Sequence, residues 1–317
     1  MSKIYTIEPL DKLQQEYLAA ETGLEVVQLE RSSFLSHKED CLQIEILICR
    51  DRDNVLKIIE ICSHLKLIFI VSTGVEKLPF SKIKEKGIVV CNTGGINAPI
   101  MSEYVMGAIL QHSTRFRENI LNQTQQYWKK FQCVDSLNEK KLLVVGAGRT
   151  GQLIARKAKA FGMYVVGVKK HFENVPFFDN IVSLDSLDEE LNEADFVVCT
   201  IPLTSETFHL FDYTKFEKMK ESAVFINISR GKICVEKDLV EALTKQKLAC
   251  AVLDVFDKEP LEKDNALWNC PNVVITPHSS GRLDNFMSEA IKYAANNINA
   301  FLKGEELPNK VNLEYGY

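Results

Sequence analysis

The sequence predicts an α/β protein with two doubly wound domains, each built around a parallel sheet. Two observations support this prediction. Short apolar runs alternate with charged, helix-like segments along the chain, which is the order of elements that builds parallel sheets. The chain is also 317 residues long, which exceeds what one hydrophobic core usually serves, so two domains are expected.

The first series of elements contains a set of short apolar runs that we interpret as strands. They cover residues 3–7, 25–29, 42–49, 67–71 and 88–91. An uninterrupted segment with little Gly or Pro follows at residues 98–118 and predicts a long helix. We expect this helix to carry the chain out of the first domain.

A second series of apolar runs has the rhythm of a doubly wound sheet. The runs cover residues 141–145, 163–168, 195–200, 223–228, 249–254 and 272–276. The amphipathic stretch at residues 285–302 comes after the last strand and is expected to pack back on the N-terminal elements. Residues 1–97 with 285–317 are therefore predicted to form one discontinuous domain, and residues 98–284 the other.

The composition indicates a globular protein with a small-molecule partner. Apolar residues make up 46% of the chain and charged residues 26%, which are ordinary values for a protein with a full core. The net charge of -5, with both signs mixed along the chain, does not favour nucleic-acid binding. No apolar run approaches the roughly 20 residues of a membrane span, and no charged leader precedes an apolar stretch.

The cysteines predict a cytoplasmic location. The chain has 9 of them, scattered through apolar runs and without a CxxC pair. This pattern is typical of reduced thiols in a cytosolic protein rather than of a disulfide framework. No cluster of side chains has metal-ligand spacing, so no metal site is predicted.

Gly146, Gly148 and Gly151 form a GxGxxG motif directly after the predicted strand at residues 141–145. The spacing provides a tight turn, close approach of the backbone to a pyrophosphate, and close packing of a helix on the strand. Strand, motif, helix and next strand come in the required order. The motif therefore predicts a dinucleotide-binding, Rossmann-like domain rather than an incidental glycine turn.

The residue after the second strand of this domain bears on the choice of cofactor. An acidic residue is expected there for NAD, about 20 residues past the motif. The sequence instead has Lys169, with Lys170 and His171 beside it, so positive charge lies where NADP carries its 2′-phosphate. We therefore expect NADP(H) to be preferred over NAD(H). A solvated lysine pair is the alternative interpretation.

Arg230, Glu259 and His278 each follow an apolar strand of the second series, on the side where a parallel sheet builds its ligand crevice. Reduction of a 2-oxoacid needs a donor for the carboxylate, a proton for the developing alkoxide, and a group that keeps the proton source charged. The guanidinium of Arg230 suits the first task. His278 suits the second because histidine titrates near neutral pH, and the carboxylate of Glu259 suits the third.

Each of these residues has a simpler explanation when taken singly. Arg230 could be a surface arginine beside Gly231, Glu259 a turn carboxylate before Pro260, and His278 a turn histidine. Only their common placement at strand ends favours a catalytic set.

Several short motifs are distributed over nearly the whole chain. They are Ser72-Thr-Gly-Val75, Gly87-Ile-Val-Val-Cys-Asn92, Gly146 to Gly151, Ile201-Pro-Leu-Thr204 with Glu206-Thr207, Asn227-Ile-Ser-Arg-Gly231, Leu253-Asp-Val-Phe-Asp-Lys-Glu-Pro260, Thr276-Pro-His278 and Pro308-Asn-Lys-Val-Asn312. Together they resemble the D-isomer-specific 2-hydroxyacid dehydrogenase family. The resemblance implies that the catalytic set falls on Arg230, Glu259 and His278.

The resemblance also implies further contacts. Backbone amides around Thr73, Gly74 and Val75 are expected to help hold the substrate carboxylate. The residues implied to line the cofactor are Arg149, Thr150, Pro202, Thr207 and Asp254. Members of the family usually pair through the cofactor domain with a long helix like the one predicted at residues 98–118, so a homodimer is expected.

Two departures from the family pattern stand out. Lys169 replaces the common acidic residue, which makes the chain similar to the NADP-using glyoxylate and hydroxypyruvate reductases. Val75 and Glu76 replace the usual Gly-x-Asp pattern after Gly74, which leaves the shape of the substrate pocket open.

The predicted function is NAD(P)H-dependent reduction of a small 2-oxoacid to a D-2-hydroxyacid, with His278 as the proton donor. Glyoxylate, hydroxypyruvate and short-chain 2-oxoacids are all candidate substrates. Two alternatives stay open, a short phosphoglycerate-type dehydrogenase and a dinucleotide-sensing regulator of the same fold. Glu259 argues against a formate dehydrogenase, which resembles this family but has glutamine beside the histidine.

Overall fold

The computed structural model describes residues 2–31, 41–50, 54–130, 132–170 and 175–314. The chain divides into two compact units. Unit 1 comprises Met1–Ile96 and Leu283–Tyr317, and unit 2 comprises Asn97–Arg282. The sequence predicts the first boundary after residue 97, one residue later than in the structure, and the second after residue 284, two residues later.

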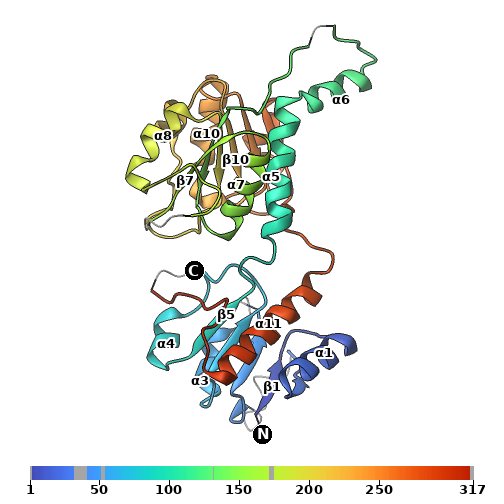
Figure 1. The fold of residues 1–317 in the computed structure, drawn as a ribbon, viewed down its shortest axis with the longest axis vertical. Coiled ribbons are helices and arrows are strands. Elements are labelled where there is room, and N and C mark those ends of the chain that lie inside the picture. Colours follow the sequence, from blue (N-terminus) through green and yellow to red (C-terminus); the bar gives the residue numbers. More distant parts are fainter. Residues whose placement is uncertain (1, 32–40, 51–53, 131, 171–174, 315–317) are drawn as a thin grey trace. The chain divides into compact units, whose positions relative to one another are not determined.

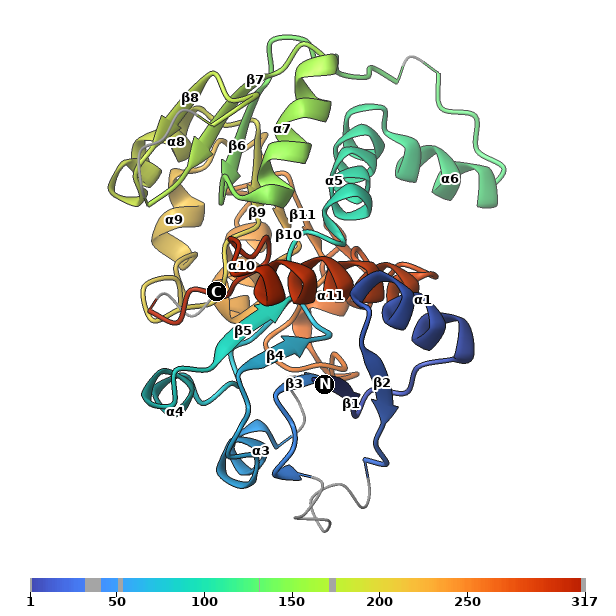
Figure 2. The same cartoon turned by 60° about the horizontal axis from the view of Figure 1, so that its bottom comes forward.

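Unit 1 contains a parallel sheet in the order β2-β1-β3-β4-β5, drawn in blue to cyan in Figure 2. Its strands are β1 (Lys3–Thr6), β2 (Glu25–Gln28), β3 (Ile46–Cys49), β4 (Leu67–Ile70) and β5 (Val89–Asn92). Its helices are α1 (Lys12–Thr22), α3 (Val55–Ile61), α4 (Phe80–Glu85) and α11 (Phe286–Lys303). This strand order is that of a doubly wound sheet.

Helices cover both faces of the unit 1 sheet. In β4, Leu67 and Phe69 pack with α1 and α11, whereas Ile68 and Ile70 pack with α3 and α4. All four side chains are completely buried. Burial on both faces explains why the strands of this unit are continuous apolar runs in the sequence. The helix α11, from the C-terminal part of the chain, thus packs on the sheet formed by the N-terminal residues.

Unit 2 contains a larger parallel sheet in the order β12-β11-β10-β9-β6-β7-β8. Its strands are β6 (Lys141–Val145), β7 (Tyr164–Val168), β8 (Asn180–Val182), β9 (Phe196–Cys199), β10 (Val224–Asn227), β11 (Cys250–Leu253) and β12 (Val273–Ile275). From β6 the chain first adds strands on one side and then, from β9 onward, on the other. This reversal defines a doubly wound Rossmann-like sheet, so the predicted fold class is confirmed.

The helices of unit 2 also lie on both faces of its sheet (Figure 1). The α-helices are α5 (Ala98–Ser113), α6 (Phe116–Thr124), α7 (Arg149–Ala160), α8 (Leu187–Glu193), α9 (Tyr213–Lys218) and α10 (Glu236–Thr244), and the short 3-10 helices are η2 (Leu184–Ser186), η3 (Gly231–Ile233) and η4 (Ala266–Asn269). Val144 of β6 packs with α5 and α7, whereas Val145 packs with α8, α9 and α10.

The structure differs from the predicted strands in two ways: one predicted strand is shorter, and one strand was not predicted. The strand expected at residues 42–49 is β3 over Ile46–Cys49 only. The amide of Ile44 donates to the carbonyl of Cys41, so the backbone turns ahead of the strand and leaves Leu42 53% exposed. The predictions also lack β8, which has 3 residues and is too short to produce a hydrophobic period.

The long helix expected at residues 98–118 is two helices. α5 ends at Ser113 and α6 begins at Phe116. The hydroxyls of Ser113 and Thr114 donate to carbonyls one turn earlier, and Arg115 adopts a left-handed φ of 55°, which an L-residue rarely has inside a helix. The chain therefore bends, and α6 extends away from the remainder of unit 2 (Figure 1).

Within the described residues, no helix is both long and apolar enough to cross a membrane. The same residues contain no group of three or more His, Cys, Asp or Glu side chains placed to hold a metal ion. The 9 cysteines all fall inside the described ranges, and none of them forms a disulfide.

We expect Cys133 to be the only thiol that reacts quickly in the folded protein, because it is the exposed one. Burial raises the pKa of Cys62, Cys91 and Cys199 to about 12. The thiolate is the reactive form, so near pH 8 these side chains are both shielded and protonated. Titration with Ellman's reagent should therefore show a fast phase of about one equivalent.

The variant Cys133→Ser should lose this fast phase, and unfolding in urea should release every thiol. A fast phase of several equivalents in the folded wild-type protein would show that the buried cysteines are accessible.

Candidate active site

The sequence-predicted residues of unit 2 lie beyond strand ends, at the carboxyl edge of the sheet. Gly146 follows β6, Lys169 follows β7 and Asp254 follows β11 directly. Arg230 and His278 come a few residues after β10 and β12. Because all these strands are parallel, their carboxyl ends meet at one edge. The order reverses between β6 and β9, the place where doubly wound sheets bind ligands.

Gly146, Gly148 and Gly151 each meet a different constraint. Gly146 has a φ of 115°, and a Cβ there would lie 2.7 Å from Thr200 Oγ1. A Cβ on Gly151 would lie 2.2 Å from the main-chain oxygen of Gly146, so only glycine lets α7 start this close to the turn. A Cβ on Gly148 would meet no protein atom within 4 Å. That side of the backbone is open to a ligand.

The N-terminus of α7 suits a pyrophosphate. The helix begins at Arg149, directly after Gly148, with no side-chain cap and no acidic residue in its first turn. Its first amides have no partner within the helix, and the peptide dipoles make this end positive. Arg149 is exposed and Thr150 is half-buried beside these amides. The residues present therefore fit a dinucleotide.

Lys169 and Lys170 lie directly beyond β7. The amide of Lys169 donates to Val182 of β8, which fixes the backbone at this point. The ammonium of Lys170 lies 2.8 Å from the carboxylate of Glu206, on the loop after β9. The charge of Lys170 is thus offset by Glu206, a contact that sequence analysis did not predict because the ion pair joins segments distant in the chain. His171 lies outside the described residues.

The loop after β9 is closed by Thr207. Its hydroxyl donates to the carbonyl of Pro202 at 2.7 Å and accepts from the amide of Thr204 at 2.8 Å. Thr207 is only 9% exposed. Both bonds are to other residues of the same loop, so Thr207 stabilises the conformation of the loop after β9. Pro202, in this loop, is half-buried.

Glu259 and His278 form a direct pair. Nδ1 of His278 lies 2.7 Å from Oε2 of Glu259, and Oε1 of Glu259 accepts from the amide of Phe256 at 3.0 Å. A carboxylate only accepts hydrogen bonds, so Nδ1 carries the shared proton. Nε2 is therefore the ring nitrogen left to meet a ligand, and the His278 side chain is 53% exposed.

Asp254 holds the turn that carries His278. Its carboxylate is 0% exposed and accepts from the hydroxyl of Thr276 and the amides of Ser279 and Ser280. Its main-chain oxygen accepts from the amide of His278. His278 has a left-handed φ of 50°, which costs an L-residue about 1–2 kcal/mol. The bonds to Asp254 offset this cost and fix the direction of the imidazole.

Asn227 holds the loop that carries Arg230, as Asp254 holds the turn that carries His278. It is the last residue of β10, is 1% exposed, and its side-chain amide donates to the carbonyl of Arg230 at 3.0 Å. The following residue, Gly231, lies so close to the loop of Glu259 that a Cβ there would be 1.9 Å from the carbonyl carbon of Phe256. The loops of Arg230 and Glu259 therefore pack backbone on backbone.

Sequence analysis did not single out Asn227 or Gly231 as residues that build the site. A polar residue at the end of an otherwise apolar strand is the signal that points to Asn227. Nothing local in the sequence marks the contact of Gly231, because its partner loop lies farther along the chain.

Thr73, Gly74 and Val75 belong to unit 1 and lie beyond β4. The carbonyl of Thr73 accepts from the side-chain amide of Asn92 at 2.9 Å, and the carbonyl of Gly74 accepts from the hydroxyl of Ser72 at 2.7 Å. Val75 is 2% exposed and packs in the core of unit 1. The segment is thus held firmly at the carboxyl edge of its own sheet.

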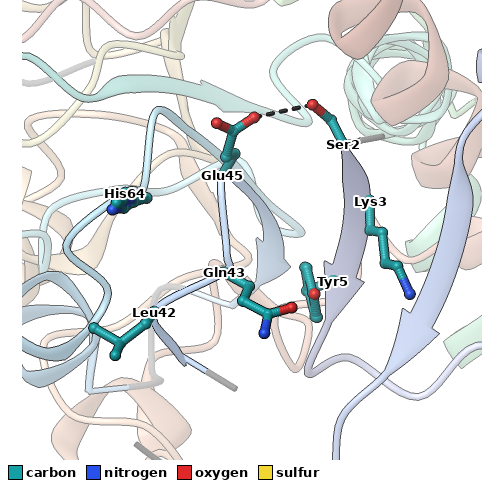
Figure 3. Close-up of a pocket in the computed structure, with 7 residues that line it drawn as sticks. All are labelled: Ser2, Lys3, Tyr5, Leu42, Gln43, Glu45 and His64. Atoms are coloured by element: carbon teal, nitrogen blue, oxygen red, sulfur yellow. Dashed lines mark hydrogen bonds between the residues drawn. The ribbon is translucent and has the colours of Figure 1, made fainter. Parts of the chain in front are cut away.

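A surface pocket of about 390 Å³ lies at the other edge of the unit 1 sheet (Figure 3). Its lining residues are Ser2, Lys3, Tyr5, Leu42, Gln43, Glu45 and His64. Glu45 accepts from Ser2 and pairs with Lys66, and the Lys66 contact lowers the pKa of Glu45. Ligands of parallel sheets bind at carboxyl ends, whereas Ser2 and Lys3 stand at the amino end of β1. The pocket is not part of the candidate site.

Comparison with known proteins shows which family the chain resembles. The model for the D-isomer specific 2-hydroxyacid dehydrogenase NAD binding domain matches residues 106–280, which include the strand-end residues of unit 2 described above. The glyoxylate reductase/hydroxypyruvate reductase of Mus musculus is 31% identical, and the match covers 99% of this chain and 98% of that protein.

Two further relatives extend the comparison. The D-3-phosphoglycerate dehydrogenase of Methanocaldococcus jannaschii is also 31% identical over 99% of this chain, but the chain spans only 60% of its length. A crystal structure of an NADPH-dependent glyoxylate/hydroxypyruvate reductase from Sinorhizobium meliloti, in complex with NADP and sulfate, is 25% identical. It covers 100% of both chains with a TM-score of 0.83.

These matches and the strand-end geometry lead to one conclusion. The chain belongs to the D-isomer specific 2-hydroxyacid dehydrogenase family, whose members are NAD(P)-dependent oxidoreductases.

Proposed function

We propose that the protein is a cytoplasmic reductase that uses NADPH to convert a small 2-oxoacid, such as glyoxylate or hydroxypyruvate, into a D-2-hydroxyacid. The pair formed by Glu259 and His278 carries the proposal, because it provides an oriented proton donor at the sheet edge that holds the glycine turn. The names of the mouse and Sinorhizobium relatives support the substrate class. Cysteines without disulfides favour the cytoplasm.

His278 is the proposed general acid. Because Nδ1 is engaged by Glu259, Nε2 is the atom that gives its proton to the oxygen of the substrate as an alkoxide develops there. The carboxylate of Glu259 accepts the hydrogen bond from Nδ1 and holds the ring in one orientation. A bound nicotinamide supplies the hydride.

Arg230 is the proposed ligand of the substrate carboxylate. Its guanidinium presents parallel N–H groups that match the two oxygens of a carboxylate. The carbonyl oxygen of Arg230 is held by Asn227, which fixes the base of the side chain. We propose the backbone amides of Thr73, Gly74 and Val75 as further donors to the same carboxylate. A substrate held at its carboxylate has its carbonyl in a defined position, which lowers the entropic part of the barrier.

The decisive experiment is a substrate panel followed by nicotinamide absorbance. The purified protein is given NADPH or NADH with glyoxylate, hydroxypyruvate, pyruvate, longer 2-oxoacids and 3-phosphohydroxypyruvate. Rapid oxidation of NADPH with a small 2-oxoacid supports the proposal. Turnover with 3-phosphohydroxypyruvate alone would identify a phosphoglycerate-type enzyme, and no turnover at all would favour the dinucleotide-sensing regulator.

His278→Ala should lower kcat by about 100- to 10,000-fold, which is the usual contribution of a general acid. The Kd for NADPH, followed by quenching of protein fluorescence, should stay close to wild type because the glycine turn is unchanged. His64→Ala is the matched control, since His64 is an exposed histidine on unit 1, and it should keep full activity. A His278→Ala enzyme with wild-type kcat would remove His278 from the mechanism.

Lys169→Asp should shift cofactor preference toward NADH. An aspartate at the end of β7 would repel the 2′-phosphate of NADPH and accept hydrogen bonds from the 2′-hydroxyl of NADH. We test Lys169 because it directly follows β7, the strand end where the ribose of the cofactor is expected. The ratio of kcat/KM for NADPH to that for NADH should fall at least about tenfold, the loss of one good charged contact.

Lys247→Asp is the matched control for the charge change, because Lys247 precedes β11 at the amino edge of the same sheet. It should leave the cofactor ratio unchanged. An unaltered ratio in Lys169→Asp would show that the lysine does not contact the phosphate.

We propose a homodimer formed through an arm that consists of α6 with the described residues 125–130 and 132–134. No residue of α6 is buried, although the helix carries Phe116, Ile120 and Leu121, and a cluster of exposed apolar side chains is typical of an interaction site. The exposed large hydrophobic side chains of the arm are Phe116, Ile120, Leu121, Tyr127, Trp128 and Val134, and Trp128 is 86% exposed. The arm extends from unit 2 (Figure 1). A second copy of the chain, expected from the resemblance, would cover it.

Replacement of Leu121 and Trp128 together by serine should convert a dimer into a monomer, measured by sedimentation velocity at micromolar concentration. Aromatic and aliphatic anchors contribute most of the energy of such interfaces. Leu13→Ser, on α1 of unit 1 and 76% exposed, should leave the sedimentation coefficient unchanged. A wild-type protein that sediments as a monomer would refute the proposed assembly.

A further inference from the structure

A series of partly buried hydrogen bonds leads from helix α5 to the turn of His278. The phenol oxygen of Tyr104 lies 2.7 Å from the hydroxyl oxygen of Thr276. The hydroxyl of Thr276 donates to Oδ1 of Asp254 at 2.6 Å. Asp254 in turn accepts from the amides of Ser279 and Ser280, the two residues that follow His278.

The donor and the acceptor of each of these hydrogen bonds can be assigned. A hydroxyl has one proton, and that of Thr276 is committed to the carboxylate of Asp254, so Tyr104 must donate to Thr276. Burial, together with the nearby carboxylate of Asp254, raises the pKa of Tyr104. The phenol therefore keeps its proton at neutral pH and is the first donor of the hydrogen-bond series.

Tyr104 lies on the helix that begins unit 2. α5 starts at Ala98, just after the chain leaves unit 1, and it packs along α7, which follows the glycine turn. Gly281 lies against the first turns of α5, since a Cβ there would be 3.4 Å from Asn97 and 3.5 Å from Met101. The segment after His278 therefore runs back along α5, and Tyr104 ties the two together.

We propose that Tyr104 and Thr276 are positioning residues for His278: they fix the carboxylate of Asp254, and through it the turn of residues 276–280, relative to α5. This inference rests on the proposed function, because it assigns a purpose to the orientation of the imidazole. Neither residue touches the substrate. Their effect is on the fraction of enzyme in which Nε2 of His278 is correctly directed.

The first test compares kcat with KM. Thr276→Val should lower kcat about tenfold and Tyr104→Phe about fivefold, the sizes expected when one hydrogen bond that supports the transition state is lost. KM for NADPH should stay within about twofold of wild type, because the cofactor turn is not altered. Thr276→Ser keeps the hydroxyl and should restore wild-type kcat.

A double variant shows whether the two residues act as one chain. Tyr104→Phe combined with Thr276→Val should have the kcat of Thr276→Val alone, since the phenol has no acceptor once the hydroxyl is gone. Tyr164→Phe is the matched control, because Tyr164 is an exposed tyrosine at the start of β7, and it should behave as wild type. Independent, multiplicative losses of kcat would overturn the proposal.

A second measurement does not depend on turnover. Hydrogen–deuterium exchange of the peptide that contains Ser279 and Ser280 should be faster in Tyr104→Phe and Thr276→Val than in wild type, whereas the peptide of the glycine turn should be unchanged. If the wild-type protein reduces none of the acids, the proposed function fails, and this exchange result alone decides whether Tyr104 anchors the turn. Unchanged exchange in both variants would overturn the inference.

Discussion

The buried carboxylate of Asp254 is the interaction on which the candidate site depends. A carboxylate without exposure to water is stable only when its oxygens are fully hydrogen-bonded. Asp254 meets that requirement with the hydroxyl of Thr276 and two amides of the turn after β12. The same bonds hold His278 in a left-handed conformation that an isolated turn would not favour. The need to satisfy a buried charge therefore determines where the imidazole points.

Close contact between backbones supplies the second constraint. Gly151 allows α7 to begin against the turn at Gly146, and Gly231 allows the loop of Arg230 to rest on the loop of Glu259. Any side chain at these glycines would overlap main-chain atoms, which cannot move aside as a flexible side chain can. The distances within the candidate site are thus fixed by the backbone, and the side chains proposed to react need little reorganisation of their own.

The electrostatics of the sheet edge divide into two regions. Around the glycine turn, the N-terminus of α7 and Arg149 form a positive region without an acidic residue in the first helical turn. Around His278, the carboxylate of Glu259 provides a negative charge beside the ring. The proposed cofactor carries phosphates, whereas the proposed proton donor, His278, lies beside a carboxylate, so the two need opposite surroundings. The parallel sheet provides both along one edge, because each strand end carries its own loop.

Much of this arrangement follows from the sequence alone. Two-sided burial makes the strands of both sheets continuous apolar runs, so their number and order along the chain are readable, with β8 as the exception because it is an edge strand of 3 residues. The glycine spacing predicts the dinucleotide turn, and polar residues after strands predict Arg230, Glu259 and His278, since these signals are local. The break between α5 and α6 has a weaker local signal, the hydroxyls of Ser113 and Thr114.

The remaining features are contacts between distant segments, which no local pattern records. The ion pair of Lys170 with Glu206, the packing of Gly231 on Phe256 and the chain from Tyr104 to Asp254 all join residues that the fold alone brings together. The sequence by itself determined the types of residues at the strand ends and hence the chemistry available. Only the tertiary structure decided which of them touch, because hydrogen bonding of a buried charge and close packing of backbones are satisfied by the whole fold at once.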